Sequence, residues 1–209
     1  YPFNGNANDE SGNGNDGEVH GATLIADRNG ESGKAYGFDG EDDFIQANHI
    51  DAYTASDYSI SLWFNSKQSD NSEFLISKGR HNYEVHLVSP SLGNTGIRFL
   101  PRLGASGSDH WDSPNGSYSF DTWHQLIAIF NPTVDKIQLF IDGKIQELKG
   151  ESKFSVGNSN DSSIRIGRRM DEQGGYQFHG SIDDVRIYNR ALSETEVAAL
   201  YELEGNFVT

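Results

Sequence analysis

The feature that most constrains the fold is the regular return of turn residues. Clusters of glycine, asparagine and aspartate recur about every 8–12 residues, and short runs of alternating apolar and polar residues lie between them. Alternation with a period of two is typical of a half-buried β-strand. The strands expected on this basis span residues 35–38, 43–47, 59–64, 73–77, 83–88, 96–100, 123–130, 136–141, 163–167 and 180–188.

Two dipeptides mark tight turns between these strands. Asp39-Gly40 separates 35–38 from 43–47, and Asp142-Gly143 follows 136–141. Asp-Gly is favoured in two-residue type I′ turns, because both central residues there need a positive φ. Each dipeptide therefore predicts a hairpin.

One helix is expected, and it comes last in the chain. Ser193 and Glu196 form a capping-box pattern, and Val197, Leu200 and Tyr201 follow at helical spacing. Ten strands followed by one short helix predict an all-β fold, namely a two-sheet antiparallel jelly-roll sandwich with one short C-terminal helix. We expect one domain over residues 1–205 and a tail or linker remnant at 206–209.

The charge and the residue types exclude several function classes. The chain has 31 acidic and 16 basic residues, a net charge of −15, and no cysteine. Such acidity disfavours nucleic acid and anionic lipid as partners, and no apolar run approaches the roughly 20 residues that span a bilayer. The absence of cysteine excludes disulfides, thiolate metal sites and cysteine nucleophiles. Because the chain opens without a leader pattern, we interpret it as a mature or excised domain, monomeric in isolation.

Several segments resemble one family when they are taken in order. They are FNGNANDESGNG at 3–14, GKAYGFDG at 33–40, YSISLWF at 58–64, WH at 123–124, FIDG at 140–143 and GSIDDVRIYNRALS at 180–193. Together they resemble the laminin-G-like, concanavalin A-like jelly rolls of the bacterial type, over about residues 3–203. The resemblance implies the jelly-roll fold, but the fold alone does not fix a function.

The segment from Asp9 to Gly14 predicts a calcium site. Its oxygen-bearing side chains alternate before a glycine, and Ca²⁺ takes six to eight oxygen ligands. The spacing fits the first half of an EF-hand loop, but the twelfth position is His20, so an EF-hand is not expected. The family resemblance suggests a partner on the closing strand, where alternation turns Asp183 inward.

The predicted ligands of a structural Ca²⁺ are thus Asp9, Asn13 and Asp183, with backbone carbonyls of the loop. The alternative is a plain turn, with Asp183 accepting backbone N–H groups.

A ligand surface is expected around the long polar segment 104–117, which has Trp111 at its centre. Arg98 and Arg102 share one strand face, and Arg169 and Tyr176 flank another loop. Exposed aromatic rings stack on sugars, and arginine suits carboxylate or sulfate groups, so the predicted ligand is a glycan, in particular an acidic one. The alternatives are that Trp111 anchors its own loop and that the arginines pair with neighbouring acidic residues.

No catalytic residues are predicted. The expected strands carry no pair of carboxylates two positions apart, as a retaining glycosidase would place them, and no nucleophile elbow or zinc-protease motif occurs. The leading hypothesis is a calcium-stabilised, extracellular glycan-binding module of a larger secreted or surface bacterial protein, either an adhesin or a carbohydrate-active enzyme. The alternatives are a structural or protein-binding spacer of an adhesin, and a polysaccharide lyase or glycoside hydrolase.

Overall fold

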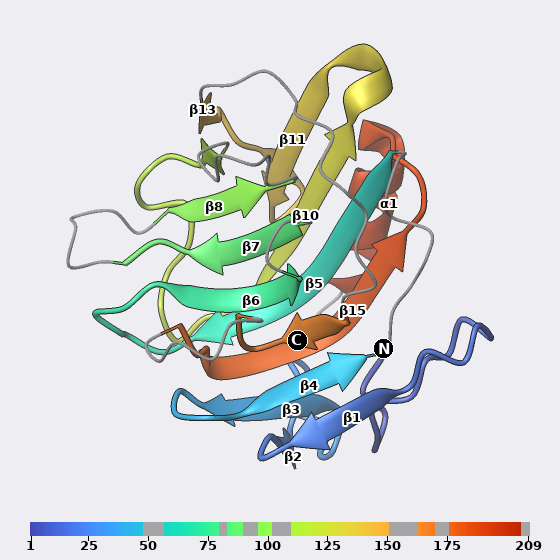
Figure 1. Cartoon of the computed structure of the whole chain (residues 1–209), viewed down its shortest axis with the longest axis vertical. Helices are drawn as coiled ribbons and strands as arrows, with labels where there is room; N and C mark the ends of the chain where they lie inside the picture. Colours follow the sequence, from blue (N-terminus) through green and yellow to red (C-terminus); the bar gives the residue numbers. More distant parts are fainter. Residues whose placement is uncertain are drawn as a thin grey trace.

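The fold was analysed in a computed structural model of the 209-residue chain. The structure describes residues 1–47, 57–79, 83–89, 96–101, 110–150, 163–169 and 176–205. These residues form two antiparallel sheets that lie face to face, with one α-helix behind them (Figure 1).

The first sheet has eight strands in the described part of the chain. Their spatial order is β1 (Gly17–His20), β4 (Phe44–Ala47), β14 (Ile164–Ile166), β6 (Glu73–Lys78), β7 (Tyr83–Leu87), β8 (Ile97–Leu100), β9 (Trp111–Asp112) and β13 (Lys149–Gly150).

The second sheet has seven described strands. Their spatial order is β12 (Lys144–Ile145), β11 (Lys136–Ile141), β10 (His124–Asn131), β5 (Tyr58–Ser66), β15 (His179–Tyr188), β3 (Ala35–Asp39) and β2 (Thr23–Ile25). A short 3₁₀ helix, η3 (Pro132–Val134), joins β10 to β11.

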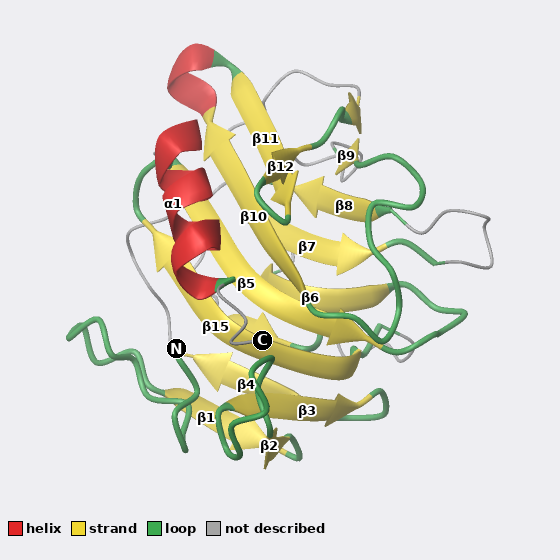
Figure 2. Ribbon diagram, turned by 180° about the vertical axis from the view of Figure 1, so that it is seen from behind, coloured by secondary structure: helices red, strands yellow, loops and turns green. Residues whose placement is uncertain are grey.

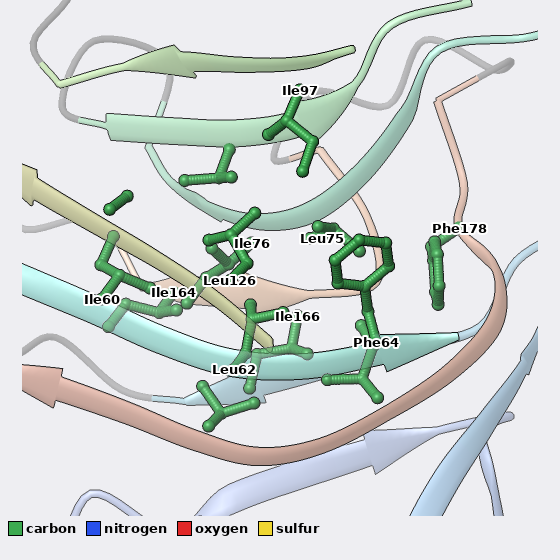
Figure 3. Close-up of a cluster of buried hydrophobic side chains, with 14 of the residues drawn as sticks. Ile60, Leu62, Phe64, Leu75, Ile76, Ile97, Leu126, Ile164, Ile166 and Phe178 are labelled. Carbon is green, nitrogen blue, oxygen red and sulfur yellow. The ribbon is translucent and has the colours of Figure 1, made fainter. Parts of the chain in front are cut away.

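The main core fills the space between the sheets. Figure 3 shows its centre, where Leu62 and Phe64 of β5 face Ile76 of β6 and Ile166 of β14. These side chains are fully buried. In regular strands such as β5 every second residue points into the core, so the alternation that predicts these strands is also the alternation that builds the core.

The helix α1 (Glu194–Glu204) lies on the outer face of the seven-stranded sheet, across β5, β10 and β15 (Figure 2). Its N-terminus has the predicted capping box: the Ser193 hydroxyl accepts the Glu196 N–H, and the Glu196 carboxylate accepts the Ser193 N–H. A second, smaller apolar cluster lies between α1 and this sheet, and it includes Ile127, Phe140 and Val197. The all-β jelly-roll prediction is confirmed.

Of the two predicted hairpin turns, one is confirmed and one is wrong. Asp142 and Gly143 have φ values of 50° and 70°, and they join β11 to β12 as a hairpin. Asp39-Gly40 is a turn as well, but the strands on its two sides belong to different sheets. This turn therefore crosses the sandwich. Local sequence cannot distinguish the two cases, because the same backbone turn serves either connection.

A β-bulge in β15 changes the orientation of the residues that follow it. The pairing of β15 with β5 shifts register between Asp183 and Arg186, and Asp184 has a φ of 47°. Both Ile182 and Val185 point into the main core, which regular alternation would not allow. The prediction that Asp183 shares the inward face of Val185 is therefore wrong: Asp183 pairs with Trp63 and faces the α1 side.

Candidate functional site

The outer face of the eight-stranded sheet is the sheet face that α1 leaves open. Ile45, Leu75 and Val85 of its strands point into the core, so the residues just before them, Phe44, Phe74 and Glu84, point outward. Four of the seven described arginines lie on this side, at positions 98, 165, 168 and 169. In a chain with a net charge of −15, this concentration of arginine sets the face apart.

The centre of this face is an arginine held between two aromatic rings. The Arg169 guanidinium carbon lies 5.4 Å from the ring centroid of Phe74 and 5.4 Å from that of Tyr176. Its Nε donates to Glu84 Oε1 at 3.2 Å, an ion pair in which the Glu84 side chain is buried. The structure thus brings the predicted site residues Arg169 and Tyr176 together.

Next to this group lies His86 of β7, whose ring stacks on Phe74 at 4.4 Å between centroids. The His86 ring is buried, and its Nδ1 has no hydrogen-bond partner among the described residues. Burial, together with the charges of Arg98 and Arg169, lowers the pKa of His86 to about 3. His86 is therefore neutral at physiological pH and brings no positive charge to the face.

Arg98, another of the predicted site arginines, pairs with a carboxylate of its own sheet. Arg98 donates from Nε and Nη2 to the two carboxylate oxygens of Asp112, at 2.7 and 2.8 Å. Hydrogen bonding to Asp112 raises the pKa of Arg98. Arg98 and Arg169 thus both pair with neighbouring acidic residues, which is the alternative stated in the sequence analysis. Arg102 lies outside the described residues.

Trp111 does not join this group. It pairs with the core residue Phe99 across β8 and β9, so it points to the other side of the sheet from Arg98. There it is half-buried and lines a cavity of about 410 Å³ together with residues of β11 and of the segment that follows it, including Lys136, Gln138 and Leu148. The sequence reading placed Trp111 in a loop because the two-residue strand β9 is too short to give an alternation signal.

A second arginine cluster lies on the same face, toward β1. Arg165 and Arg168 place their guanidinium carbons 4.6 and 5.6 Å from the ring centroid of Phe44. The His20 ring stacks on Phe44 at 4.3 Å. The site predicted from the sequence did not include Arg168. The sequence reading also missed Phe44 and His20, whose pairing depends on a strand, β1, that it did not predict.

The predicted calcium loop forms one wall of a cavity of about 390 Å³, and the second half of β15 forms the other. Asp9 and Asn13 both line it, together with Glu10, Asn15 and Tyr188. The Asp9 carboxylate accepts the backbone N–H groups of Ser11 and Asn15, at 2.9 and 3.0 Å. Partial burial opposes ionisation of Asp9, but these hydrogen bonds outweigh it and lower the pKa.

Asp183 is not among the described residues that line this cavity. Its carboxylate is buried and pairs with Arg28 at 2.5 Å, while the same guanidinium contacts Asp184 at 2.8 Å. Arg28 also lies over the Trp63 ring at 4.7 Å. The cation that the inward Asp183 was expected to need is thus an arginine of the chain itself.

The three predicted calcium ligands therefore do not fit a single site. Asp9 and Asn13 share one loop and both line one cavity, and their carboxylate and amide groups are of the type that can bind a cation. Asp183 belongs to the arginine cluster on the α1 side and is already neutralised by Arg28.

One described arrangement places a serine, a histidine and an aspartate in a row. His124 Nδ1 lies 2.7 Å from Asp142 Oδ2, and its Nε2 lies 3.1 Å from the Ser119 hydroxyl. However, Nε2 also accepts the backbone N–H of Ser119 at 3.0 Å, so its lone pair is already used. A general base needs that lone pair free. We therefore infer that these hydrogen bonds stabilise the β11–β12 turn.

Fold and site together define a class of protein: a two-sheet jelly-roll domain with a helix on one sheet and an open, arginine-bearing face on the other. The family model described as the concanavalin A-like lectin/glucanases superfamily, of laminin G type, matches residues 39–198. The chain belongs to this family, as the sequence motifs predicted. Within the described residues, no helix is long and apolar enough to cross a membrane.

Among curated proteins, the chain is similar to adhesion G-protein coupled receptor V1 of Danio rerio. The two are 26% identical over 157 residues, which cover 70% of this chain and 2% of the receptor. The chain therefore corresponds to a very small part of that protein.

Solved structures with a similar fold include bacterial toxin binding domains. The binding domain of Paraclostridial Mosquitocidal Protein 1 matches with a TM-score of 0.71 and 19% identity, over 95% of this chain and 50% of that one. The botulinum neurotoxin DC binding domain in complex with SialylT matches with a TM-score of 0.69 and 13% identity, over 94% and 48%. The same toxin domain in complex with rat synaptotagmin II matches with a TM-score of 0.68 and 16% identity, over 94% and 48%. The chain spans about half the length of these domains, and the likeness shows the fold.

Proposed function

We propose that the chain is a non-catalytic glycan-binding module and that it binds its ligand on the outer face of the eight-stranded sheet. One observation carries the proposal: on the sheet face that α1 leaves open, Tyr176 and Arg169 form a half-buried aromatic–guanidinium pair supported by Phe74. A tyrosine ring offers a flat apolar surface with a polar edge, which suits a sugar ring. The guanidinium offers further N–H donors to hydroxyl or acidic groups.

The relatives support a binding role in general terms. The botulinum neurotoxin DC domain has been seen in complex with SialylT, and the zebrafish relative is an adhesion receptor. We extend the role to this chain and place the module in an extracellular or surface protein. We also expect it to be a monomer in isolation, which light scattering after size-exclusion chromatography would measure.

Substitutions on the outer face of the eight-stranded sheet should weaken ligand binding. Tyr176→Ala and Arg169→Ala should each lower the affinity for any glycan that the wild type binds by about tenfold, because each removes a contact of roughly 1–2 kcal/mol. Glycan arrays would identify the ligand, and isothermal titration calorimetry would measure the affinity. The matched control is Leu203→Ala, which removes an exposed side chain of α1. Equal losses in all three variants would place the ligand elsewhere, and no binding by the wild type to any glycan would refute the proposal.

A protein ligand is the second candidate, because the neurotoxin DC domain has also been seen in complex with rat synaptotagmin II. This candidate predicts no glycan affinity. It would be favoured if the wild type bound no glycan on the arrays but bound a defined protein, and if Tyr176→Ala abolished that protein binding.

We also retain calcium in the proposal, limited to the loop that contains Asp9 and Asn13. Both side chains line the cavity beside β15, and carboxylate and amide oxygens are the ligands that Ca²⁺ prefers. When bound there, the ion would fasten the N-terminal loop to the closing strand.

A further inference from the structure

Arg168 differs from most of the arginines that the structure describes. In the described structure, arginines at positions 28, 98, 169, 186 and 190 each form an ion pair with a carboxylate. Arg168 forms none with any described residue, although acidic residues outnumber basic ones 31 to 16. Among the described residues, its guanidinium makes a single hydrogen bond, from Nη1 to the backbone carbonyl of Asp42 at 3.4 Å.

Arg168 is nevertheless held in place. Its guanidinium carbon lies 5.6 Å from the Phe44 centroid, and that of Arg165 lies 4.6 Å from the same centroid. Arg165 Nε donates to Gln46 Oε1, a neutral acceptor, at 3.2 Å. Two guanidinium groups are thus fixed on one ring at the open sheet face. Because they are ordered before any ligand arrives, binding would cost little further side-chain entropy.

One histidine and several acidic residues lie near this arginine pair. His20, stacked on Phe44, lies 3.6 Å from Glu18. The carboxylates of Asp39, Asp42 and Asp43 gather within 4.8 Å of one another in the turn that crosses the sandwich. None of these acids forms an ion pair with Arg168. They border the arginine pair, and an anion from solution would be the first charge to contact Arg168 directly.

We infer that Arg165 and Arg168, on the Phe44 ring, form a subsite for an anionic substituent of the ligand, either a sulfate ester or a carboxylate. The inference rests on the proposed function, since it names the class of glycan that the same face prefers. The planar fork of a guanidinium matches both oxyanions and makes two parallel hydrogen bonds to either. The two anions share this chemistry, so the experiment separates them.

The test measures binding of three matched oligosaccharides by calorimetry: one sulfated, one bearing uronic acids, and one neutral. The wild type should bind at least one of the acidic oligosaccharides about tenfold or more tightly than the neutral one. Arg168→Ala and Arg165→Ala should each remove most of that preference and leave the affinity for the neutral oligosaccharide unchanged. Arg168→Lys, which keeps the charge but loses the fork, should recover only part of the preference.

The matched control is Lys144→Ala, which removes one exposed positive charge from the edge of the other sheet. It should keep the full acidic preference. Equal affinity of the wild type for acidic and neutral oligosaccharides would overturn the inference and leave the proposed function standing. An acidic preference that Arg168→Ala does not change would also overturn it.

If no oligosaccharide binds, the proposed function fails, and a second experiment tests whether the subsite binds an oxyanion. Inorganic sulfate would be titrated into the ¹⁵N-labelled protein while the Arg168 side-chain Nε–H signal is followed. A saturable shift of that signal, absent with chloride at equal ionic strength and absent in Arg165→Ala, would support an oxyanion subsite. No saturable shift would refute it.

Discussion

At the scale of single residues, the carboxyl of Glu73 is unusual because it is buried and has no ion pair among the described residues. It is almost fully buried at the start of β6, opposite the core residue Leu87, and a Ser66 hydroxyl lies 3.3 Å from Oε2. Burial dominates the hydrogen bonds that oppose it and raises the pKa of Glu73 to about 7. The folded protein therefore holds this proton more tightly than the unfolded chain does.

The sign of the pH dependence follows directly. The contribution of Glu73 to stability is complete below a pH of about 4.5, and it is lost as the pH rises to about 7. With about 1.4 kcal/mol for each pKa unit, the loss amounts to about 3 kcal/mol. Glu73→Gln should remove this slope and make the protein more stable than the wild type at pH 8.

Urea unfolding of both proteins at pH 4.5 and pH 8 would measure the effect. His86, with its pKa lowered to about 3, contributes the opposite slope below pH 6.5, but it is present in both proteins and cancels in the difference. Parallel pH profiles for the wild type and Glu73→Gln would show that the burial of Glu73 does not perturb its ionisation.

At the scale of elements, polar contacts near the C-terminus of α1 attach it to its sheet, in addition to the apolar cluster around Val197. The buried Glu204 carboxylate accepts Trp63 Nε1–H at 2.8 Å and Gln125 Nε2–H at 2.9 Å, and it also pairs with Arg186. The Glu204 carbonyl accepts Arg28 Nε–H at 3.1 Å. Arg28 also pairs with Asp183 and Asp184 at the bulge of β15. It thus connects its own loop, after β2, to both α1 and β15.

Removing Arg28 should therefore be costly. Arg28→Ala would leave Asp183 buried without its cation and should destabilise the domain by about 3–5 kcal/mol. The control is Arg190→Ala, because Arg190 also pairs with a carboxylate, that of Glu196, but in solvent. Exposed pairs contribute little to stability, so this control should lose far less than Arg28→Ala. Urea unfolding at pH 7 would measure both variants, and similar losses would contradict the role given to Arg28.

The elements also show what the sequence could predict. Alternation identified the long strands β5, β10 and β15, and the capping box identified α1, because those signals are local. It missed β1, β2, β9, β12 and β13, which have two to four residues each. It also misplaced Asp183, since a bulge depends on the pairing with β5 and leaves no mark in the alternation.

The candidate site divides in the same way. Arg169 and Tyr176 could be named from the sequence because they flank one loop, and the structure places them together on Phe74. The Phe44 cluster draws residues from β1, β4 and the end of β14, so its assembly depends on long-range strand order. No local pattern encodes that order.

At the scale of the whole molecule, calcium would act through the native state alone. At a hundredfold excess over its Kd, a bound ion adds about 2.7 kcal/mol, which should raise the midpoint of thermal unfolding by roughly 5–10 °C relative to chelator. Asp9→Ala should abolish the shift. Asp183→Ala should lower the midpoint equally with and without calcium, because it disrupts the Arg28 cluster. An unchanged midpoint of the wild type would mean that the loop is only a turn.

The attachment of both end segments to β15 has a mechanical consequence. Tyr1 exchanges two backbone hydrogen bonds with Val185, at 2.9 and 3.0 Å, and Glu204 pairs with the next residue, Arg186. Tension applied between Tyr1 and Glu204 would thus pass through the seven-stranded sheet, at β15 and at the partners of Glu204 on β5 and β10, and would largely bypass the eight-stranded sheet. The Phe44 and Phe74 clusters would carry almost none of the load. A ligand on the open face would then stay bound while the domain is stretched, until the contacts of Val185 and Arg186 yield.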